Sequence, residues 1–109
     1  MAKTGPSVKR IISQYAQELK KMGIMPARII LYGSYATGHP RKESDIDLVI
    51  VSENFKDKNL RERLELLGLA AGRVFEPIEA LGYTEGEITS QEKGGFLDEI
   101  IAKGVVVAL

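Results

Sequence analysis

The sequence of 109 residues predicts a small α/β domain, with a mixed sheet of about four strands flanked by helices. Three observations support this prediction. Short apolar runs rich in Ile and Val alternate with longer segments whose apolar residues recur at helical spacing. The length suits one domain. No repeat, low-complexity segment or linker divides the chain. We therefore expect residues 1–109 to form a single domain.

The first predicted element is an amphipathic helix near the N-terminus. Its apolar residues lie three or four positions apart, and charged residues occupy the opposite side. Pro6 suits the start of a helix, and Gly23 suits its end. The apolar positions are Val8, Ile11, Ile12, Tyr15, Ala16, Leu19 and Met22.

Two strands are predicted next, at residues 27–33 and 45–51. Both are short, apolar and rich in β-branched side chains. Neither alternates between polar and apolar residues, which is typical of a strand covered on both faces. Ile46 and Leu48 should point into the core.

The second half continues the alternation. Residues 57–74 form an amphipathic pattern that predicts a helix, and residues 77–83 predict a third strand. A short helical turn is expected at residues 84–88. The apolar positions of the long helix are Leu60, Leu64, Leu67, Ala71 and Val74.

A last helix and a last strand complete the predicted order. Thr89 and Glu92 have the spacing of a capping box at a helix start. The helix that follows has apolar residues at 96, 97, 100 and 101, and Gly104 would end it. Residues 105–109 predict a short strand, which as an exposed edge could pair with a second copy.

Composition excludes several kinds of function. Fifteen basic and fifteen acidic residues give no net charge, which argues against broad nucleic-acid binding. The absence of cysteine excludes disulfides and thiol nucleophiles. With a single histidine, any metal must be held by oxygen ligands, which suits magnesium, manganese or calcium.

Nothing in the sequence indicates a membrane protein. No apolar run approaches the roughly 18 residues that a membrane span needs. Residues 1–7 lack the apolar stretch of a signal peptide. The expected location is cytoplasmic.

Gly33 and Ser34 directly follow the first predicted strand. If a short helix begins at Ser34, successive backbone N–H groups at its start would be unpaired and would attract an anion such as phosphate. Glycine allows a phosphate oxygen to approach the backbone closely. The hydroxyl of Ser34 can add a further contact.

Asp45 and Asp47 stand two residues apart on the next predicted strand. Side chains alternate along a strand, so both carboxylates should project from one face. Two such charges repel unless a cation lies between them. A divalent metal would neutralise them and could bridge them to a phosphate held at Gly33 and Ser34.

Two other motifs do not fit this stretch. A P-loop needs Lys and Ser or Thr where the chain has His39 and Pro40. A calcium loop needs a ligand and a glycine where the chain has Val49 and Ile50. Two solvated aspartates at the start of a strand remain the plain alternative.

The combined motif resembles a known family. Gly33-Ser34, ten intervening residues and Asp45-Ile46-Asp47 match the G-S-x10-D-x-D signature of the DNA polymerase β nucleotidyltransferase superfamily. The chain most resembles the minimal nucleotidyltransferases, and the resemblance implies a polymerase β-like fold. Where this family commonly has G-S-x-A-R-G, the chain has Thr37 at the arginine position.

The resemblance implies a metal-dependent transfer of a nucleoside monophosphate, expected to be AMP from ATP, to a hydroxyl acceptor. Two Mg²⁺ or Mn²⁺ ions would be held by Asp45, Asp47 and a third carboxylate. Glu79 is the expected third carboxylate, and Glu76 is the alternative. The expected nucleotide-binding residues are Gly33, Ser34, Thr37, Arg41 and Lys42. For Arg41 and Lys42, a solvated turn is the alternative.

Resemblance also implies a partner. Minimal nucleotidyltransferases are often paired with a helical HEPN-type protein as toxin–antitoxin modules, in which the transferase modifies a tyrosine of its partner. A non-catalytic antitoxin-like or regulatory binding module is one alternative. A small-molecule, antibiotic-type nucleotidyltransferase completed by a partner subunit is another, and a purely structural domain is a third.

Overall fold

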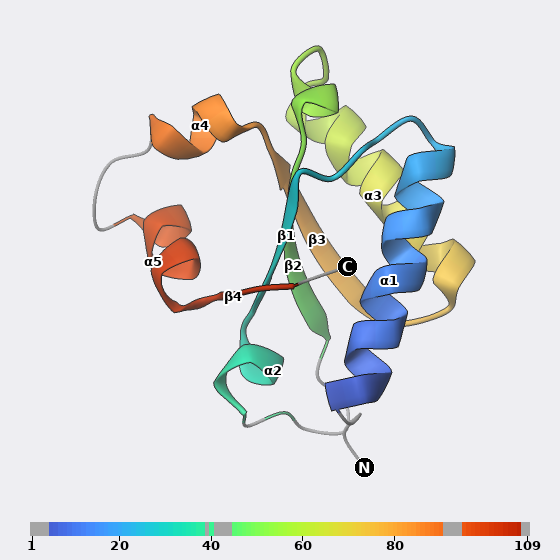
Figure 1. Ribbon diagram of the computed structural model, residues 1–109. Coiled ribbons are helices and arrows are strands. Elements are labelled where there is room, and N and C mark those ends of the chain that lie inside the picture. The colour runs from blue at the N-terminus through green and yellow to red at the C-terminus, as the bar shows by residue number, and fades with distance from the viewer. Residues whose placement is uncertain (1–4, 39, 41–44, 91–94, 108–109) are drawn as a thin grey trace.

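The computed structural model describes residues 5–38, 40, 45–90 and 95–107 (Figure 1). Helices and strands alternate along the chain, which confirms the predicted α/β class. In chain order, the elements are α1 (Gly5–Lys21), β1 (Arg28–Tyr32), α2 (Ser34–Thr37), β2 (Ile46–Val51), the 3-10 helix η1 (Glu53–Phe55), α3 (Leu60–Val74), β3 (Ile78–Tyr83), α4 (Glu85–Thr89), α5 (Phe96–Lys103) and β4 (Val105–Val106).

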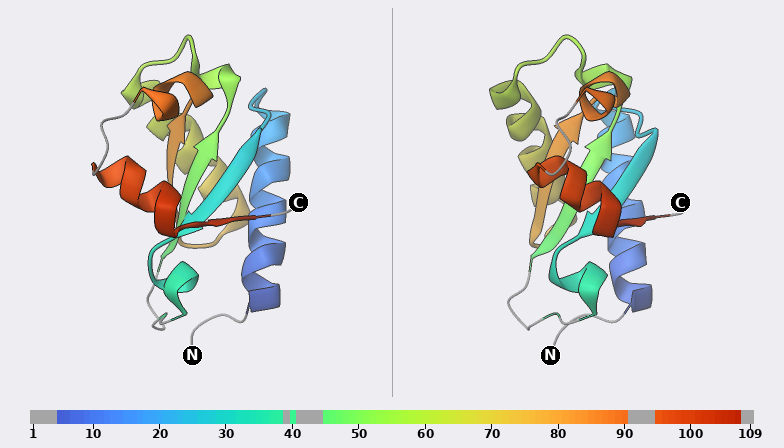
Figure 2. Two further views of the ribbon diagram at one scale, coloured as in Figure 1. Left: turned by 60° about the vertical axis from the view of Figure 1, so that its left-hand side comes forward. Right: turned by 90° about the vertical axis from the view of Figure 1, so that its left-hand side faces the viewer.

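The four strands form one mixed sheet in the order β3-β2-β1-β4. Strand β1 is antiparallel to both β2 and β4, whereas β2 and β3 are parallel. Helices α1 and α3 lie on one face of the sheet, and α5 lies on the other (Figures 1 and 2). The crossover between β2 and β3 runs through α3, as a parallel pair requires.

The main core lies between the sheet and the pair α1 and α3. Ile46, Leu48 and Ile50 of β2 are fully buried there, which confirms the predicted inward direction of Ile46 and Leu48. Tyr15 of α1 is also fully buried, and its hydroxyl donates to the Leu67 carbonyl at 2.9 Å. This bond satisfies the phenol and ties α1 to α3.

A second, smaller core covers the opposite face. Val49 and Val51 of β2 pack there with Ile30 of β1 and with Leu97 and Ile100 of α5. Every β2 residue from Leu48 to Val51 is therefore buried. This two-sided burial explains why β2 shows no polar alternation.

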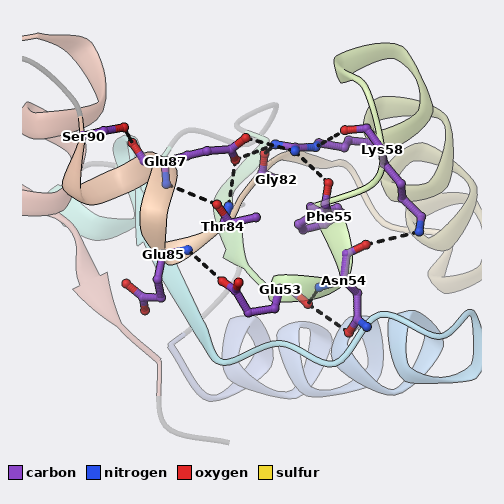
Figure 3. A network of polar contacts seen from close by, with 11 residues as sticks. Glu53, Asn54, Phe55, Lys58, Gly82, Thr84, Glu85, Glu87 and Ser90 are labelled. Atoms are coloured by element: carbon purple, nitrogen blue, oxygen red, sulfur yellow. Dashed lines mark hydrogen bonds and ion pairs between the residues drawn. The ribbon is translucent and has the colours of Figure 1, made fainter.

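An arginine links the elements at one end of the sheet. Arg63 of α3 is 8% exposed and donates to the carbonyls of Lys58, Gly82 and Phe55. It also pairs with both carboxylate oxygens of Glu87, at 2.7 and 3.0 Å. Figure 3 shows these partners converging from η1, β3 and α4. The network joins α4 to the sheet.

Several predicted boundaries need correction. Helix α3 begins at Leu60 rather than at residue 57, because Asn59 and Glu62 form a reciprocal capping box there. The capping box predicted at Thr89 is wrong, since Thr89 is the last residue of α4 and Glu92 lies outside the described residues. A capping box of Thr84 and Glu87 begins α4 directly after β3, whereas α5 begins after Gly95, which makes no side-chain capping bond.

The closing strand is shorter than predicted. Pairing with β1 is limited to Val105 and Val106, and the Val107 amide adds one bond to the Ile29 carbonyl at 2.9 Å. Both paired valines are at least half exposed. Residues 108–109 lie outside the described part of the chain. None of the helices that the structure describes is long and apolar enough to cross a bilayer.

Candidate functional site

The site begins at the turn between β1 and α2. Gly33 has φ 74° and ψ −154°, a backbone conformation that is essentially confined to glycine. Its carbonyl accepts bonds from the amides of Ala36 and Thr37, both at 3.1 Å, so α2 starts at Ser34 as predicted. A Cβ at Gly33 would overlap Oδ2 of Asp47. The turn and the carboxylate are therefore in direct contact.

Asp47 lies on β2, the central one of three neighbouring strands. It is opposite Tyr32 of β1 on one side and opposite Glu79 of β3 on the other. Residues in register share one face of a sheet, so all three project toward the α5 side. Asp45 precedes β2 by one residue and has the same parity as Asp47. The sheet thus places Asp47 beside Gly33 and Glu79 on the neighbouring strand.

The carboxylates influence one another electrostatically. Burial raises the pKa of Asp47 above its ordinary value of 3.8, and the charges of Glu79 and Asp45 raise it further. Each of these effects disfavours the ionised form. The site therefore has an excess of negative charge that a cation would relieve.

Tyr32 is part of the same cluster, although no motif in the sequence points to it. Burial raises its pKa to about 12, with added effects of Asp47, Glu79 and Tyr83. Its ring meets Phe96 edge-on, with centroids 6.4 Å apart and planes at 88°. The hydroxyl stays neutral at pH 7. Only the pairing register reveals that Tyr32 is beside Asp47.

The donor set fits a hard divalent cation, because all the candidate ligands are carboxylate oxygens. Among the described residues, however, no three carboxylates are close enough to form a ready-made metal site. Glu79 is exposed and in register with Asp47, whereas Glu76 precedes Pro77 and lies outside β3. Proximity to Asp47 thus favours Glu79 over Glu76 as the third carboxylate.

The predicted nucleotide-binding residues divide into two groups. Gly33, Ser34 and Thr37 lie on α2 and its preceding turn, and the Thr37 hydroxyl donates to the Ser34 carbonyl at 3.1 Å. Arg41 and Lys42 lie outside the described residues, as does His39. Tyr35 packs against the core between the sheet and α1, which gives it a structural role.

Two hollows share Tyr32 as a lining residue, and only the first of them is lined by a predicted carboxylate, Glu79. One, of about 320 Å³, follows the free edge of β3 and is lined by Glu79, Tyr32 and apolar residues of α3. The other, of about 150 Å³, lies between α2 and α5 and includes Gly33. A larger cavity of about 480 Å³ lies between α1 and β4 and is lined by none of the three carboxylates.

Comparison with known proteins identifies the family. Residues 12–101 match the family described as nucleotidyltransferase domain. The chain belongs to this family. The match includes both the Gly33-Ser34 turn and the Asp45-Ile46-Asp47 segment, so the nucleotidyltransferase family predicted from these residues is confirmed.

Solved structures share the fold of this nucleotidyltransferase. One, described as "Crystal structure of the toxin-antitoxin with AMP-PNP", is 18% identical with a TM-score of 0.63, and the alignment covers 92% of this chain and 72% of that chain. A putative nucleotidyltransferase from Sulfolobus solfataricus is 17% identical with a TM-score of 0.56, and the alignment covers 97% and 87%. No curated protein sequence matches the chain. At these identities the structural similarity shows the fold alone.

Proposed function

We propose that this nucleotidyltransferase transfers AMP from ATP to a hydroxyl group, and that the acceptor is a tyrosine of a helical, HEPN-type partner protein. The observation that carries the proposal is the position of Asp47. It contacts the Gly33 turn, and it is in register with Glu79. Phosphate binding at the turn and metal binding by the carboxylates would thus meet at Asp47, with Glu79 beside it.

The chain's own residues have separate roles in this proposal. The Gly33 turn and Ser34 would bind the β- and γ-phosphates. Asp45, Asp47 and Glu79 would hold Mg²⁺ or Mn²⁺. When bound, such ions neutralise charge on the phosphates and the carboxylates. Tyr32, neutral and next to Asp47, would form part of the wall of the site.

The transfer step follows from this arrangement. The acceptor oxygen forms a bond to the α-phosphorus while the bond to the bridging oxygen of the β-phosphate breaks, and pyrophosphate leaves. Glu79 would accept the acceptor's proton, because it is the exposed carboxylate at the β3 edge. No covalent intermediate on the protein is needed, since positioning and charge neutralisation provide most of the rate enhancement in such transfers.

The choice of partner rests on similarity. A chain from a structure described as a toxin-antitoxin with AMP-PNP shares this fold. We extend that context to this protein as part of the proposal, with an antitoxin role for the transferase. The hollow along β3 reaches Glu79, so an acceptor side chain could approach the site from that edge.

A non-catalytic binding module is the second candidate. Thr37 replaces the arginine common in the family, and its hydroxyl bonds to its own helix. The described residues also contain no preformed site of three carboxylates. Such a protein would bind ATP with magnesium without transferring AMP.

A labelling experiment separates these candidates. The protein would be incubated with ATP labelled at the α-phosphate, magnesium and a lysate of the source organism. Asp47→Asn would run beside it, with Asp57→Asn as a matched control at an exposed loop position. A protein band labelled by the wild type and by Asp57→Asn, but not by Asp47→Asn, would support the proposal, and its mass would identify the acceptor.

The other outcomes are equally informative. If the label appears in a small molecule and not in a protein, the acceptor is a small molecule and the proposed protein acceptor is wrong. Magnesium-dependent ATP binding without transferred label would favour the binding module. No ATP binding would contradict both candidates. Label that persists in Asp47→Asn would show that the carboxylate is not part of the machinery.

A further inference from the structure

The small pocket between α2 and α5 is lined by a positively charged side chain, Lys103, which is not part of the family signature. Its volume is about 150 Å³, and Gly33, Thr37 and Lys103 are among its lining residues. We propose that Lys103 binds the phosphate tail of the nucleotide. This inference rests on the proposed function, because it requires a triphosphate at the Gly33 turn.

The charges around the site create the need for such a residue. Asp47 lies against Gly33 and is influenced by the charges of Glu79 and Asp45, and Glu99 lines the pocket itself. A nucleoside triphosphate brings several further negative charges. Of the residues that line this pocket in the described part of the chain, Lys103 is the cation. A lysine suits the role, since its ammonium group is a compact charge with three donors.

The fold holds the backbone of Lys103 next to the turn. Helix α5 is anchored by Leu97 and Ile100, which are 4% and 6% exposed. After Lys103, the Gly104 amide donates to the Ile100 carbonyl at 2.6 Å, and the Cα of Gly104 packs against Ile30 and Leu31 of β1. The end of α5 is thus fixed beside the strand that leads into Gly33.

The side chain of Lys103, in contrast, is largely exposed. It is 74% exposed, and its Nζ lies 2.8 Å from Oε1 of Glu99. An exposed pair of this kind is weak, because water screens it and two long side chains must be ordered. A triphosphate carries more charge than one carboxylate. It should therefore draw the ammonium group away from Glu99 and toward the pocket.

Two substitutions should have opposite effects on binding. Lys103→Met should weaken the binding of ATP and of inorganic tripolyphosphate about tenfold, as expected for the loss of one contact between charged groups. Binding of adenosine should not change. Glu99→Gln should tighten the binding of both phosphate ligands, because it releases Lys103 and removes a repulsive charge. Lys103→Arg should retain most of the affinity.

Lys21→Met is the matched control. Lys21 lies in the last turn of α1 and pairs with Glu18 at 2.9 Å, so its local setting resembles that of Lys103. Lys21→Met should leave the binding of ATP and of tripolyphosphate unchanged. Dissociation constants would be measured by calorimetry with magnesium, and thermal unfolding would check that every variant is folded.

The failure of this inference can be told apart from the failure of the proposed function. If the wild type binds no ATP, the proposed function fails and the inference fails with it. If the wild type binds ATP and Lys103→Met binds it equally well, only the inference is overturned. It is also overturned if Lys103→Met weakens adenosine binding to the same degree, or if Glu99→Gln weakens ATP binding.

Discussion

At the scale of single residues, Gly33 and Asp47 depend on each other. The backbone of Gly33 has positive φ, and its Cα has no room for a methyl group because Oδ2 of Asp47 lies against it. The position needs glycine for two separate reasons, conformation and space. Glycine is the usual residue where the chain needs positive φ and where another group approaches the backbone closely.

Gly33→Ala should therefore destabilise the protein by about 1–3 kcal/mol and also abolish ATP binding, since the new methyl group would displace Asp47. Gly38→Ala is the control. Gly38 also has positive φ, of 80°, but nothing lies within 4 Å of its added Cβ. It should cost about 1 kcal/mol and leave ATP binding intact. Urea unfolding and ATP titration would measure both effects. Intact binding in Gly33→Ala would contradict the packing argument.

Asp47 should make the metal-free protein less stable at neutral pH. Burial, Glu79 and Asp45 raise its pKa above 3.8 in the folded state. The folded state then holds the proton more tightly than the unfolded chain does, so stability falls as the pH rises through this range. Asp47→Asn should raise the unfolding temperature at pH 7, and the gain should shrink toward pH 4.

Thermal unfolding from pH 4 to pH 8 with a chelator would measure this difference. Asp57→Asn, at an exposed position, should follow the wild type throughout. An Asp47→Asn variant no more stable than the wild type at pH 7 would show that the repulsion is already relieved in the folded protein. The expected combination of lost transfer activity and gained stability is typical of a functional carboxylate.

At the scale of elements, Arg63 joins α3 to η1, β3 and α4. Its guanidinium group donates to three carbonyls and to Glu87 while it is nearly buried (Figure 3). The carbonyl of Gly82 belongs to β3, the edge strand that carries Glu79. Arg63 thus helps to hold the strand on which the third carboxylate depends.

Arg63→Met should cost about 3 kcal/mol, because it leaves buried carbonyls without donors. Arg61→Met is the control two residues earlier on the same helix, where an 88% exposed side chain pairs with Glu65. It should change stability by less than about 0.5 kcal/mol. Urea unfolding compares the two. If Arg63→Met and Arg61→Met were equally stable, water would have replaced the arginine as the donor to these carbonyls.

Helix α5 depends on a close approach at its end. A Cβ at Gly104 would lie 2.6 Å from the Ile100 carbonyl oxygen and would also crowd Ile30. Gly104→Ala should therefore cost about 1–3 kcal/mol and weaken ATP binding by shifting α5 away from the Gly33 turn. Gly72→Ala, in an open position on α3, should instead stabilise the protein by about 1 kcal/mol. If Gly104→Ala is destabilised but binds ATP as the wild type does, the position of α5 does not contribute to ATP binding.

At the scale of the whole molecule, the order of the strands creates the site. Strand β2 lies between β1 and β3, so the turn after β1 and the carboxylate of β3 both meet Asp47. Nucleotide and metal should consequently stabilise the entire domain. Magnesium and ATP at about 100 times the dissociation constant should add about 2.7 kcal/mol to the free energy of unfolding.

This linkage can be measured by thermal unfolding with and without ATP. The unfolding temperature of the wild type should rise by several degrees with magnesium and ATP, and a chelator should reverse most of the rise. Asp47→Asn should show little of it. An equal rise without magnesium would indicate that the nucleotide binds without a metal ion.

Much of the fold and of the candidate site could be predicted from local patterns. Helical spacing, β-branched runs and the Gly33-Ser34 turn are set by side chains a few residues apart, so they are readable without a structure. The boundaries of α3 and of the last helix were harder to predict. Several residues there could cap a helix: α3 begins after the Asn59 and Glu62 capping box, and α5 begins after Gly95 without a side-chain cap.

The sequence by itself determined the family signature and the α/β class, because each depends on short spacings along the chain. Only the tertiary structure decided that Tyr32 and Glu79 flank Asp47, that Glu76 does not, and that Lys103 lines a pocket at Gly33. These relations join residues far apart in sequence. They depend on strand register and on where α5 packs, and no local pattern specifies either of them.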